Sequence, residues 1–215
     1  MVNPASRKLP FKARLSHTDR QAVIKEAAAR LFAARGYDGT TMEGIAEDSG
    51  VSRAVVYDHF SSKAELHATL LKSETDRLLG YVGHAVAEAP PTAEARLRAG
   101  VSAFFAFVEQ HPFAWRMIFR DPPADLQIAA AHSEIQAQAT SAIAAMLAEG
   151  ARAEGLIIAG QEARIEAFAE MLKVAQNSLA ARWWDDRTLG REQLTDWVLE
   201  FAWDGLARAL TRAPG

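Results

Sequence analysis

The stretch SGVSRAVVYDHFSSKAEL, residues 49–66, decides the fold. Ser52 and Ser62 each stand directly before a run with helical patterning, where a serine hydroxyl caps free backbone N–H groups. Arg53 and Lys63 would therefore each occupy the first residue of a helix, although the partial positive charge of a helix N-terminus disfavours a cation there. We expect an anion outside the protein to stabilise these two cations.

The helices around this stretch are predicted from apolar patterns of period 3.6. The first carries an apolar stripe within residues 23–32 and begins at a capping box formed by Thr18 and Gln21. The second is very short and follows Thr41. Together with the helix after Ser52, it gives two short helices joined by a tight glycine turn, which is the arrangement of a helix-turn-helix.

The remainder of the chain is also expected to be helical. The segment EAPPTAE interrupts the pattern. Longer helical patterns follow it at roughly 92–110, 112–120, 125–154, 161–185 and 191–212. No window has the strict alternation of β-strands. The expected fold class is all-α, with an N-terminal three-helix bundle that contains the helix-turn-helix and a larger C-terminal helical domain.

The composition is that of a soluble globular protein. Of the 215 residues, 49% are apolar and 24% are charged, and no apolar run approaches the roughly 18 residues of a membrane span. The absence of cysteine excludes disulfides, thiol nucleophiles and zinc–thiolate sites. The basic N-terminus is not followed by an apolar segment, so it is not a secretory signal. We expect a cytoplasmic protein with no membrane partner, no cofactor and no metal.

The net charge of −3 is unevenly distributed. Residues 1–17 contain Arg7, Lys8, Lys12 and Arg14 but no acidic residue. A basic arm before a folded domain can hold nucleic-acid phosphates. The same residues would also serve as a solubilising tail, and the sequence leaves both interpretations open.

The helix after Ser52 and its surroundings carry candidate contacts to nucleic acid. Val56 and Phe60 lie four residues apart and should face the core. The candidate contacts are Thr41, Ser52, Arg53, Ala54, Val55, Tyr57, His59 and Lys63. A guanidinium can read guanine through two hydrogen bonds, and small methyl groups suit the thymine methyl. Hydroxyl, imidazole and ammonium groups suit phosphate oxygens, as do the free N–H groups of helix N-termini.

Residues 18–78 closely resemble the DNA-binding domain of the TetR family of bacterial transcriptional regulators. The resemblance rests on AAARLFAARGYDGTTMEGIAEDSGVSRAVVYDHFSSKAEL. It implies phosphate contacts at Thr41, Ser52, Tyr57 and Lys63. It also implies that base reading falls to Arg53, Ala54 and Val55. The C-terminal two-thirds resembles the family's effector and dimerisation domain in its size, its helix count and the stretch ARWWDD.

This resemblance implies a division into a flexible basic arm at 1–17, a DNA-binding domain at 18–78 with its helix-turn-helix at about 41–60, and a ligand-binding and dimerisation domain at 79–215. The expected function is that of a repressor on a double-stranded, pseudo-palindromic DNA operator, released by a small apolar or aromatic effector. The alternative is an adaptor that keeps the fold without sequence-specific DNA binding.

Enzymatic activity is not expected. The sequence lacks GxGxxG, a P-loop and GxSxG, and none of its six histidines has another three or four residues away. His132 and Glu134 lie two residues apart on a predicted helix, so they would face different sides and could not share a metal.

The last two predicted helices are expected to form a homodimer interface. Residues 161–185 carry two apolar stripes, Ile165-Phe168-Leu172-Ala175-Leu179 and Ala167-Met171-Val174-Ala181. Residues 192–212 place apolar side chains nearly all round the helix axis. One stripe can pack within its own domain, whereas the second needs a partner. The alternative is that both stripes are buried within one chain.

An effector pocket is expected inside residues 79–185. Its candidate residues are Phe104, Phe105, Val108, His111, Trp115, Arg116, Ile118, Phe119, Met146, Met171 and Gln176. Apolar walls with sparse polar anchors are typical of ligand pockets, and methionine side chains adapt to varied shapes. The alternative is a solid core without a cavity.

Overall fold

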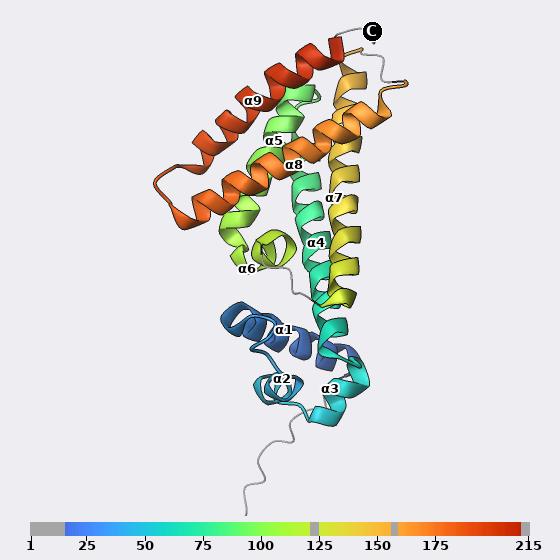
Figure 1. Cartoon of the computed structure of the whole chain (residues 1–215), viewed down its shortest axis with the longest axis vertical. Helices are drawn as coiled ribbons and strands as arrows, with labels where there is room; N and C mark the ends of the chain where they lie inside the picture. The colour runs from blue at the N-terminus through green and yellow to red at the C-terminus, as the bar shows by residue number, and fades with distance from the viewer. Residues whose placement is uncertain (1–15, 121–124, 156–158, 212–215) are drawn as a thin grey trace, which may run out of the picture. The chain divides into compact units, whose positions relative to one another are not determined.

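The computed structural model describes residues 16–120, 125–155 and 159–211, without the side chains of 126–127 and 204–211. Most of the expected basic arm lies outside the described residues. Within them the chain forms helices and no strand, which confirms the all-α fold class (Figure 1). The chain divides into two compact units, residues 1–66 and 67–215, each of which has its own core.

The first unit contains α1 (His17–Arg35), α2 (Met42–Ser49), α3 (Arg53–His59) and the start of α4 (Lys63–Glu88). Its core is built from apolar side chains of all four helices, among them Ile24, Phe32, Ile45, Val56 and Leu66. α2 packs on both α1 and α3. The predicted three-helix arrangement therefore follows from the burial of one apolar face per helix.

The start of α1 differs from the prediction. Ser16, rather than Thr18, is the N-cap: its hydroxyl accepts a hydrogen bond from the N–H of Asp19 at 3.1 Å, and Asp19 accepts one from the N–H of Ser16 at 3.3 Å. Both pairs have the spacing of a capping box. The Asp19 carboxylate is favoured over the neutral Gln21 amide because it is charged and lies in the first turn, where the helix dipole attracts an anion.

The turn of the helix-turn-helix is set by Gly50, which ends α2 in the left-handed region at φ 70° and ψ 20°. A side chain at this position would be strained, whereas glycine adopts it freely. Ser52 follows and caps α3. Val56 and Phe60 are buried as expected, with exposed fractions of 0% and 2%.

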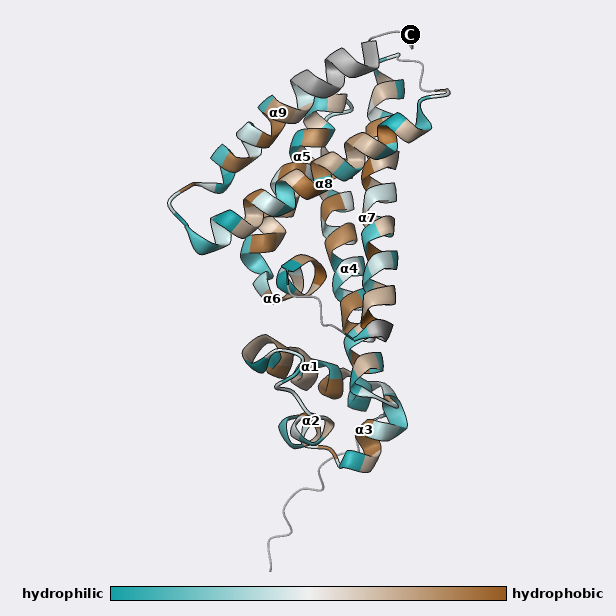
Figure 2. Cartoon of the chain, viewed as in Figure 1, coloured by the Kyte–Doolittle hydropathy of each residue, from teal (hydrophilic) through white to brown (hydrophobic). Residues whose placement is uncertain are grey.

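The second unit consists of long helices around one core. After α4 come α5 (Ala93–Gln110), α6 (Pro112–Trp115), η1 (Arg116–Arg120), α7 (Leu126–Ala153), α8 (Glu162–Asp185) and α9 (Arg191–Thr211). α7 packs along α8, and α9 packs along α5. Apolar positions recur along these helices among polar ones, as in amphipathic helices (Figure 2).

The segment predicted as one helix at 112–120 contains two kinds of helix. Pro112 begins α6, where its missing N–H is not needed. The following residues, Arg116–Arg120, form a π-helix. Trp115 of α6 and Met117 and Ile118 of the π-helix are buried in the core. Among the described residues, none of the helices combines the length and apolarity that a membrane span requires.

Candidate nucleic-acid interface and ligand cavity

The outer face of α3 carries three of the predicted contacts. Arg53 and Ala54 are exposed, and Tyr57 is 41% exposed, while Val56 on the opposite side is fully buried. The Arg53 guanidinium carbon lies 5.5 Å from the centre of the Tyr57 ring. Val55 is half-buried. The short helix thus presents a cation, a methyl group and a phenol on one surface, a set that can contact both base edges and phosphates.

Arg53 already has an anionic partner within the protein. Its Nη2 lies 2.6 Å from Oε1 of Glu43 on α2, and both side chains are largely exposed. The hydrogen bond with Tyr57 and the charge of Glu43 raise the pKa of Arg53, so it stays protonated. Glu43 thus supplies a negative charge to this cation within the protein, and a DNA contact at Arg53 stays a prediction.

Lys63 also has internal partners. Its ammonium donates hydrogen bonds to the carbonyl oxygens of Tyr37 at 2.7 Å and Thr40 at 2.9 Å, and it lies 4.1 Å from the centre of the Tyr37 ring. These carbonyls belong to the turn after α1, so Lys63 ties that turn to the start of α4. An external anion is not required here either. A phosphate contact through the third N–H of Lys63 stays a prediction.

The remaining predicted contacts have clear local roles. The Thr41 hydroxyl accepts from the N–H of Gly44 at 3.1 Å, and the Ser52 hydroxyl accepts from the N–H of Val55 at 3.3 Å. Each hydroxyl keeps its own proton to donate, for example to a phosphate oxygen. Both residues are exposed.

His59 is the least outward of the candidate DNA contacts. It is half-buried, and its ring centre lies 4.1 Å from that of His17. Burial lowers the pKa of His59, and the neighbouring His17 and Arg20 lower it further. The ring is therefore neutral near pH 7, and a charge-assisted phosphate contact from it is not favoured.

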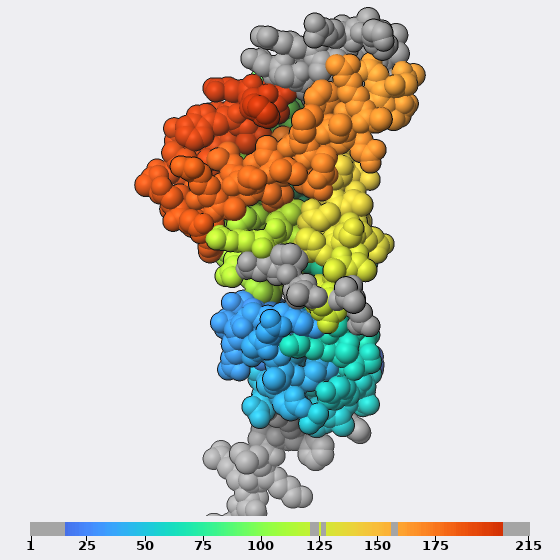
Figure 3. Space-filling model, in the orientation of Figure 1, coloured from blue at the N-terminus to red at the C-terminus, as the bar shows by residue number. Residues whose placement is uncertain are grey.

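The two apolar stripes of α8 differ in burial. Ile165 and Leu172 of the first stripe are buried, whereas Met171 and Val174 of the second are each 52% exposed. On α9, Phe201 is 74% exposed. The α8 and α9 surfaces adjoin on one face of the C-terminal unit (Figure 3). The alternative that both stripes are buried within one chain is wrong.

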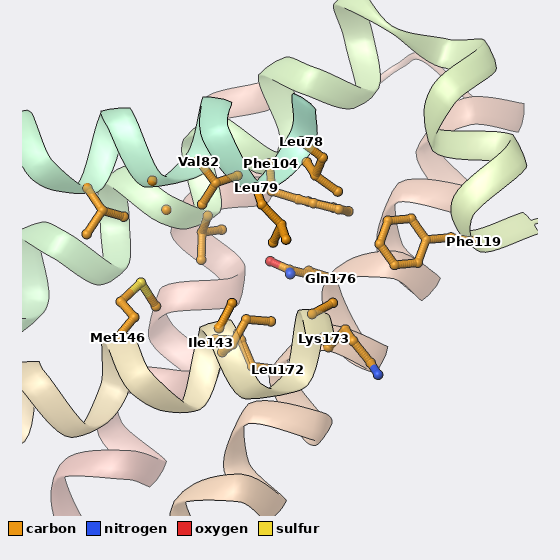
Figure 4. A pocket seen from close by; sticks show the side chains of 16 residues that line it. Leu78, Leu79, Val82, Phe104, Phe119, Ile143, Met146, Leu172, Lys173 and Gln176 are labelled. Atoms are coloured by element: carbon orange, nitrogen blue, oxygen red, sulfur yellow. The ribbon is translucent and has the colours of Figure 1, made fainter. Parts of the chain in front are cut away.

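A cavity of about 180 Å³ lies among α4, α5, α7 and α8 (Figure 4). Its lining includes Leu78, Leu79, Val82, Gly83, Val86, Gly100, Val101, Phe104, Phe119, Ala139, Ala142, Ile143, Met146, Leu172, Lys173 and Gln176. All but Lys173 and Gln176 are apolar or glycine. The C-terminal unit is therefore not a solid core.

The two polar residues of the cavity differ in their surroundings. Lys173 is 6% exposed, and its ammonium has three partners: the carbonyl of Gln136 at 3.1 Å, the hydroxyl of Thr140 at 2.7 Å and the carboxylate of Glu170 at 2.8 Å. Gln176 is 7% exposed, and its amide points into the cavity (Figure 4). No described residue forms a hydrogen bond with that amide.

Two family models match the chain. One, described as bacterial regulatory proteins, tetR family, covers residues 24–70, and the other, a tetracyclin repressor-like C-terminal domain, covers residues 93–205. The chain belongs to the TetR family. It is a transcriptional regulator with a DNA-binding helix-turn-helix, and the matches place that motif within α1–α4 and the family's C-terminal domain within α5–α9.

Relatives of this TetR-family chain include one that matches over nearly its whole length. The HTH-type transcriptional activator FasR of Mycolicibacterium smegmatis is 32% identical over 204 residues, which cover 93% of this chain and 89% of FasR. The HTH-type transcriptional regulator TtgR of Pseudomonas putida is 51% identical over 53 residues, 25% of each chain. The match to TtgR thus covers only a quarter of either protein.

Solved structures of TetR-like regulators share the fold. A TetR-like transcriptional regulator from Rhodococcus sp. RHA1 has a TM-score of 0.70 at 22% identity and covers 90% of this chain and 99% of its own. The regulator FadR from Bacillus subtilis, solved in complex with stearoyl-CoA, has a TM-score of 0.65 at 19% identity and covers 84% and 96%.

Four of the eleven predicted effector residues of this TetR-family regulator line the cavity: Phe104, Phe119, Met146 and Gln176. The other seven do not: Phe105, Val108, His111, Trp115, Arg116, Ile118 and Met171. Trp115 is 1% exposed and donates a hydrogen bond to Asn177 at 3.2 Å, so it is a core residue. Arg116 is exposed on the surface, and Met171 lies on the exposed stripe of α8.

The missed lining residues are mostly small or aliphatic side chains of α4 and α7. The prediction followed the large aromatic residues, which fill space rather than leave it open. Small residues on three helices, such as Gly83, Gly100, Ala139 and Ala142, line this cavity and are the signal in the sequence that could have indicated it. Within the described residues, no group of three or more His, Asp or Glu side chains is placed to hold a metal ion.

Proposed function

We propose that this TetR-family regulator binds a pseudo-palindromic DNA operator as a homodimer and leaves it when an apolar effector fills the cavity, acting as a repressor in the cytoplasm. The observation that carries the DNA-binding part is the exposed face of α3, where Arg53, Ala54 and Tyr57 lie together. A recognition helix contacts base edges through residues near its N-terminus, and Arg53 and Ala54 are the first two residues of α3. We assign it no catalytic reaction.

The exposed apolar stripe supports the homodimer. Met171, Val174, Trp197 and Phe201 are between 43% and 74% exposed in the single chain. Met171 and Phe201 line one apolar hollow beside α8 and α9, and Trp197 and Phe201 line a second one between these two helices. A two-fold axis would pair this face with its own copy and bury these side chains. Two α3 helices could then enter successive major grooves, about 34 Å apart.

The cavity supports an apolar effector. An engineered cavity of about 150 Å³ binds benzene, so one of about 180 Å³ can hold a ring or a short alkyl segment. The Bacillus subtilis FadR structure contains stearoyl-CoA, and FadR of Bacillus halodurans is named a fatty acid degradation regulator. We therefore propose that the effector of this chain carries an acyl or similar hydrocarbon chain.

Leu172 connects this cavity to the proposed dimer face. It lines the cavity and also a second apolar hollow with Phe168, Met171 and Phe201. A ligand that prefers one arrangement of these walls would shift the population of dimer conformations by its difference in affinity for them. Release from the operator follows if the preferred arrangement spaces the two α3 helices wrongly.

Activation is the second candidate for the direction of control. FasR, which matches over most of this chain, is named an activator. The same binding event represses when the operator overlaps a promoter and can activate when the operator lies upstream of it. DNA binding and effector response are common to both outcomes.

Selection from a pool of random DNA sequences tests this proposal against the adaptor alternative. Purified full-length protein should enrich a site with two inverted half-sites, and an octanoyl- or stearoyl-CoA supplement should reduce retention of that site. Retention of DNA with no enriched sequence would instead favour the adaptor. Enrichment without any response to either acyl-CoA would leave the operator part and remove the proposed effector class.

A further inference from the structure

The amide of Gln176 faces the cavity and has no partner among the described residues. The side chain is 7% exposed, its amide points into the cavity, and none of the described residues forms a hydrogen bond with it (Figure 4). Amide groups in protein interiors are nearly always hydrogen-bonded, because an unmet donor or acceptor destabilises the folded state. Since no described residue meets this amide, its hydrogen bonds come from whatever occupies the cavity.

The cation nearest to Gln176 in the cavity wall is already neutralised. The ammonium of Lys173 has three N–H groups, and it has three acceptors, from Gln136, Thr140 and Glu170. Figure 4 shows its nitrogen turned away from the middle of the cavity. The hydrogen bond from Lys173, followed by that from Thr140, lowers the pKa of Glu170, so the carboxylate stays charged at neutral pH.

The cavity consequently offers hydrogen bonds but no free charge. A carboxylate or phosphate placed beside Gln176 would lose its hydration without meeting an unpaired cation, which is strongly unfavourable. A neutral group meets no such penalty. The carboxamide donates through its nitrogen and accepts through its oxygen, so it can pair with a carbonyl, a hydroxyl or an amide.

We propose that the part of the effector inside this cavity is uncharged and carries one hydrogen-bonding group, a carbonyl, hydroxyl or amide, which pairs with Gln176. Any charged part of the effector lies outside the cavity. The inference rests on the proposed effector site but not on the DNA response. Gln176 is the residue that selects a polar-tipped hydrocarbon over a plain one and over an acid.

Binding of four matched probes to the full chain at pH 7 tests this assignment. The probes are hexanamide, 1-hexanol, hexanoate and hexane, and the readouts are the dissociation constant and the ¹⁵N–¹H signals of the Gln176 side-chain amide. Hexanamide and 1-hexanol should shift those signals and bind at least about tenfold more tightly than hexanoate, because an unmet buried hydrogen bond is worth that factor or more.

Two variants separate the anchor from a general effect. Gln176→Leu should keep the binding of hexane, lose the preference for 1-hexanol over hexane, and melt at the same or a higher temperature than the wild type, since an unpaired amide has been removed. Gln138→Leu removes an exposed amide of α7 that does not line the cavity. It should behave as the wild type does with all four probes.

The inference is overturned if hexanoate binds as tightly as hexanamide, if Gln176→Leu keeps the preference for 1-hexanol, or if none of the probes binds the wild type. The probe measurements use the protein without DNA, and the effect of the same probes on operator binding is measured separately. If the preference depends on Gln176 but no probe changes operator affinity, the anchor is supported and the proposed effector response is contradicted. The two claims can therefore fail separately.

Discussion

Arg53 Nη2 lies 2.6 Å from Glu43 Oε1, so an ion pair joins the first turn of α3 to the first turn of α2. Both side chains are largely exposed, and such pairs contribute only about 0–1 kcal/mol to stability. The main effect of the Arg53–Glu43 pair is on the surface that would meet DNA. Glu43 holds the guanidinium in place. Its carboxylate would also repel a nearby phosphate and disfavour contacts between Arg53 and bases other than the preferred one.

Replacing Glu43 by Gln should raise affinity for DNA of any sequence, because one repelling charge has gone, and should lower the preference for the best site. Glu47→Gln is the matched control, since Glu47 is also exposed on α2. It should raise general affinity slightly and leave the preference unchanged. Titrations of a selected site and of a scrambled site measure both effects. Equal behaviour of the two variants would mean that the Glu43–Arg53 pair has no part in sequence preference.

Lys63→Ala should reduce the free energy of unfolding by about 1–3 kcal/mol, because the carbonyls of Tyr37 and Thr40 lose a charged donor. Lys72→Ala removes a lysine of the same helix whose contact with Asp76 is a long, exposed one of 3.4 Å. It should change stability by less than about 0.5 kcal/mol. Urea unfolding compares the two. If both variants are equally stable, and Lys63→Ala only lowers the salt dependence of DNA binding, Lys63 is a phosphate contact rather than a structural tie.

Phe201→Glu should convert the proposed dimer into a monomer, since it places a charge on the most exposed apolar side chain of the face, at 74%. Ala137→Glu introduces the same charge at an exposed position of α7 and should leave the oligomeric state unchanged. Sedimentation at micromolar concentration distinguishes them. A wild type that sediments as a monomer under these conditions would contradict the dimer.

Gly83→Leu should block the cavity and abolish the effect of an acyl-CoA on operator binding. Gly83 lines the cavity. A Cβ added at this position meets no atom within 4 Å, so it would not clash with its surroundings. Gly80→Leu is the control: it lies one turn earlier on α4, also has open space around its Cβ, and does not line the cavity. Both variants should gain about 1 kcal/mol of helix stability. The cavity has no role in the response if both still release DNA.

The helix-turn-helix could be predicted from the sequence because its signals are local. Thr41 and Ser52 cap their helices, Gly50 makes the turn, and Val56 with Phe60 marks the buried face, all within twenty residues. The ion pair of Arg53 with Glu43 and the two carbonyls held by Lys63 depend on how separate helices pack. A single sequence does not give those distances.

The cavity could be predicted only in part for a different reason. A stripe of apolar residues predicts that a helix is buried, but whether the packed side chains leave a space depends on the sizes of all of them together. Phe104 and Phe119 do line the space, whereas Phe105 and Trp115 fill the core beside it. The exposure of Met171 and Val174 agrees with the expectation that only one stripe of α8 packs within its own domain, although the sequence alone left open that both are buried.

Sequence selection with the Arg53→Ala variant tests most directly the claim that the exposed face of α3 reads DNA. The wild type should enrich one inverted pair of half-sites. The variant should still bind that site but should lose discrimination at one base pair in each half-site, with a loss of about 1–3 kcal/mol for the preferred base. An unchanged preferred site, enriched to the same degree by Arg53→Ala, would contradict a base-reading role for α3.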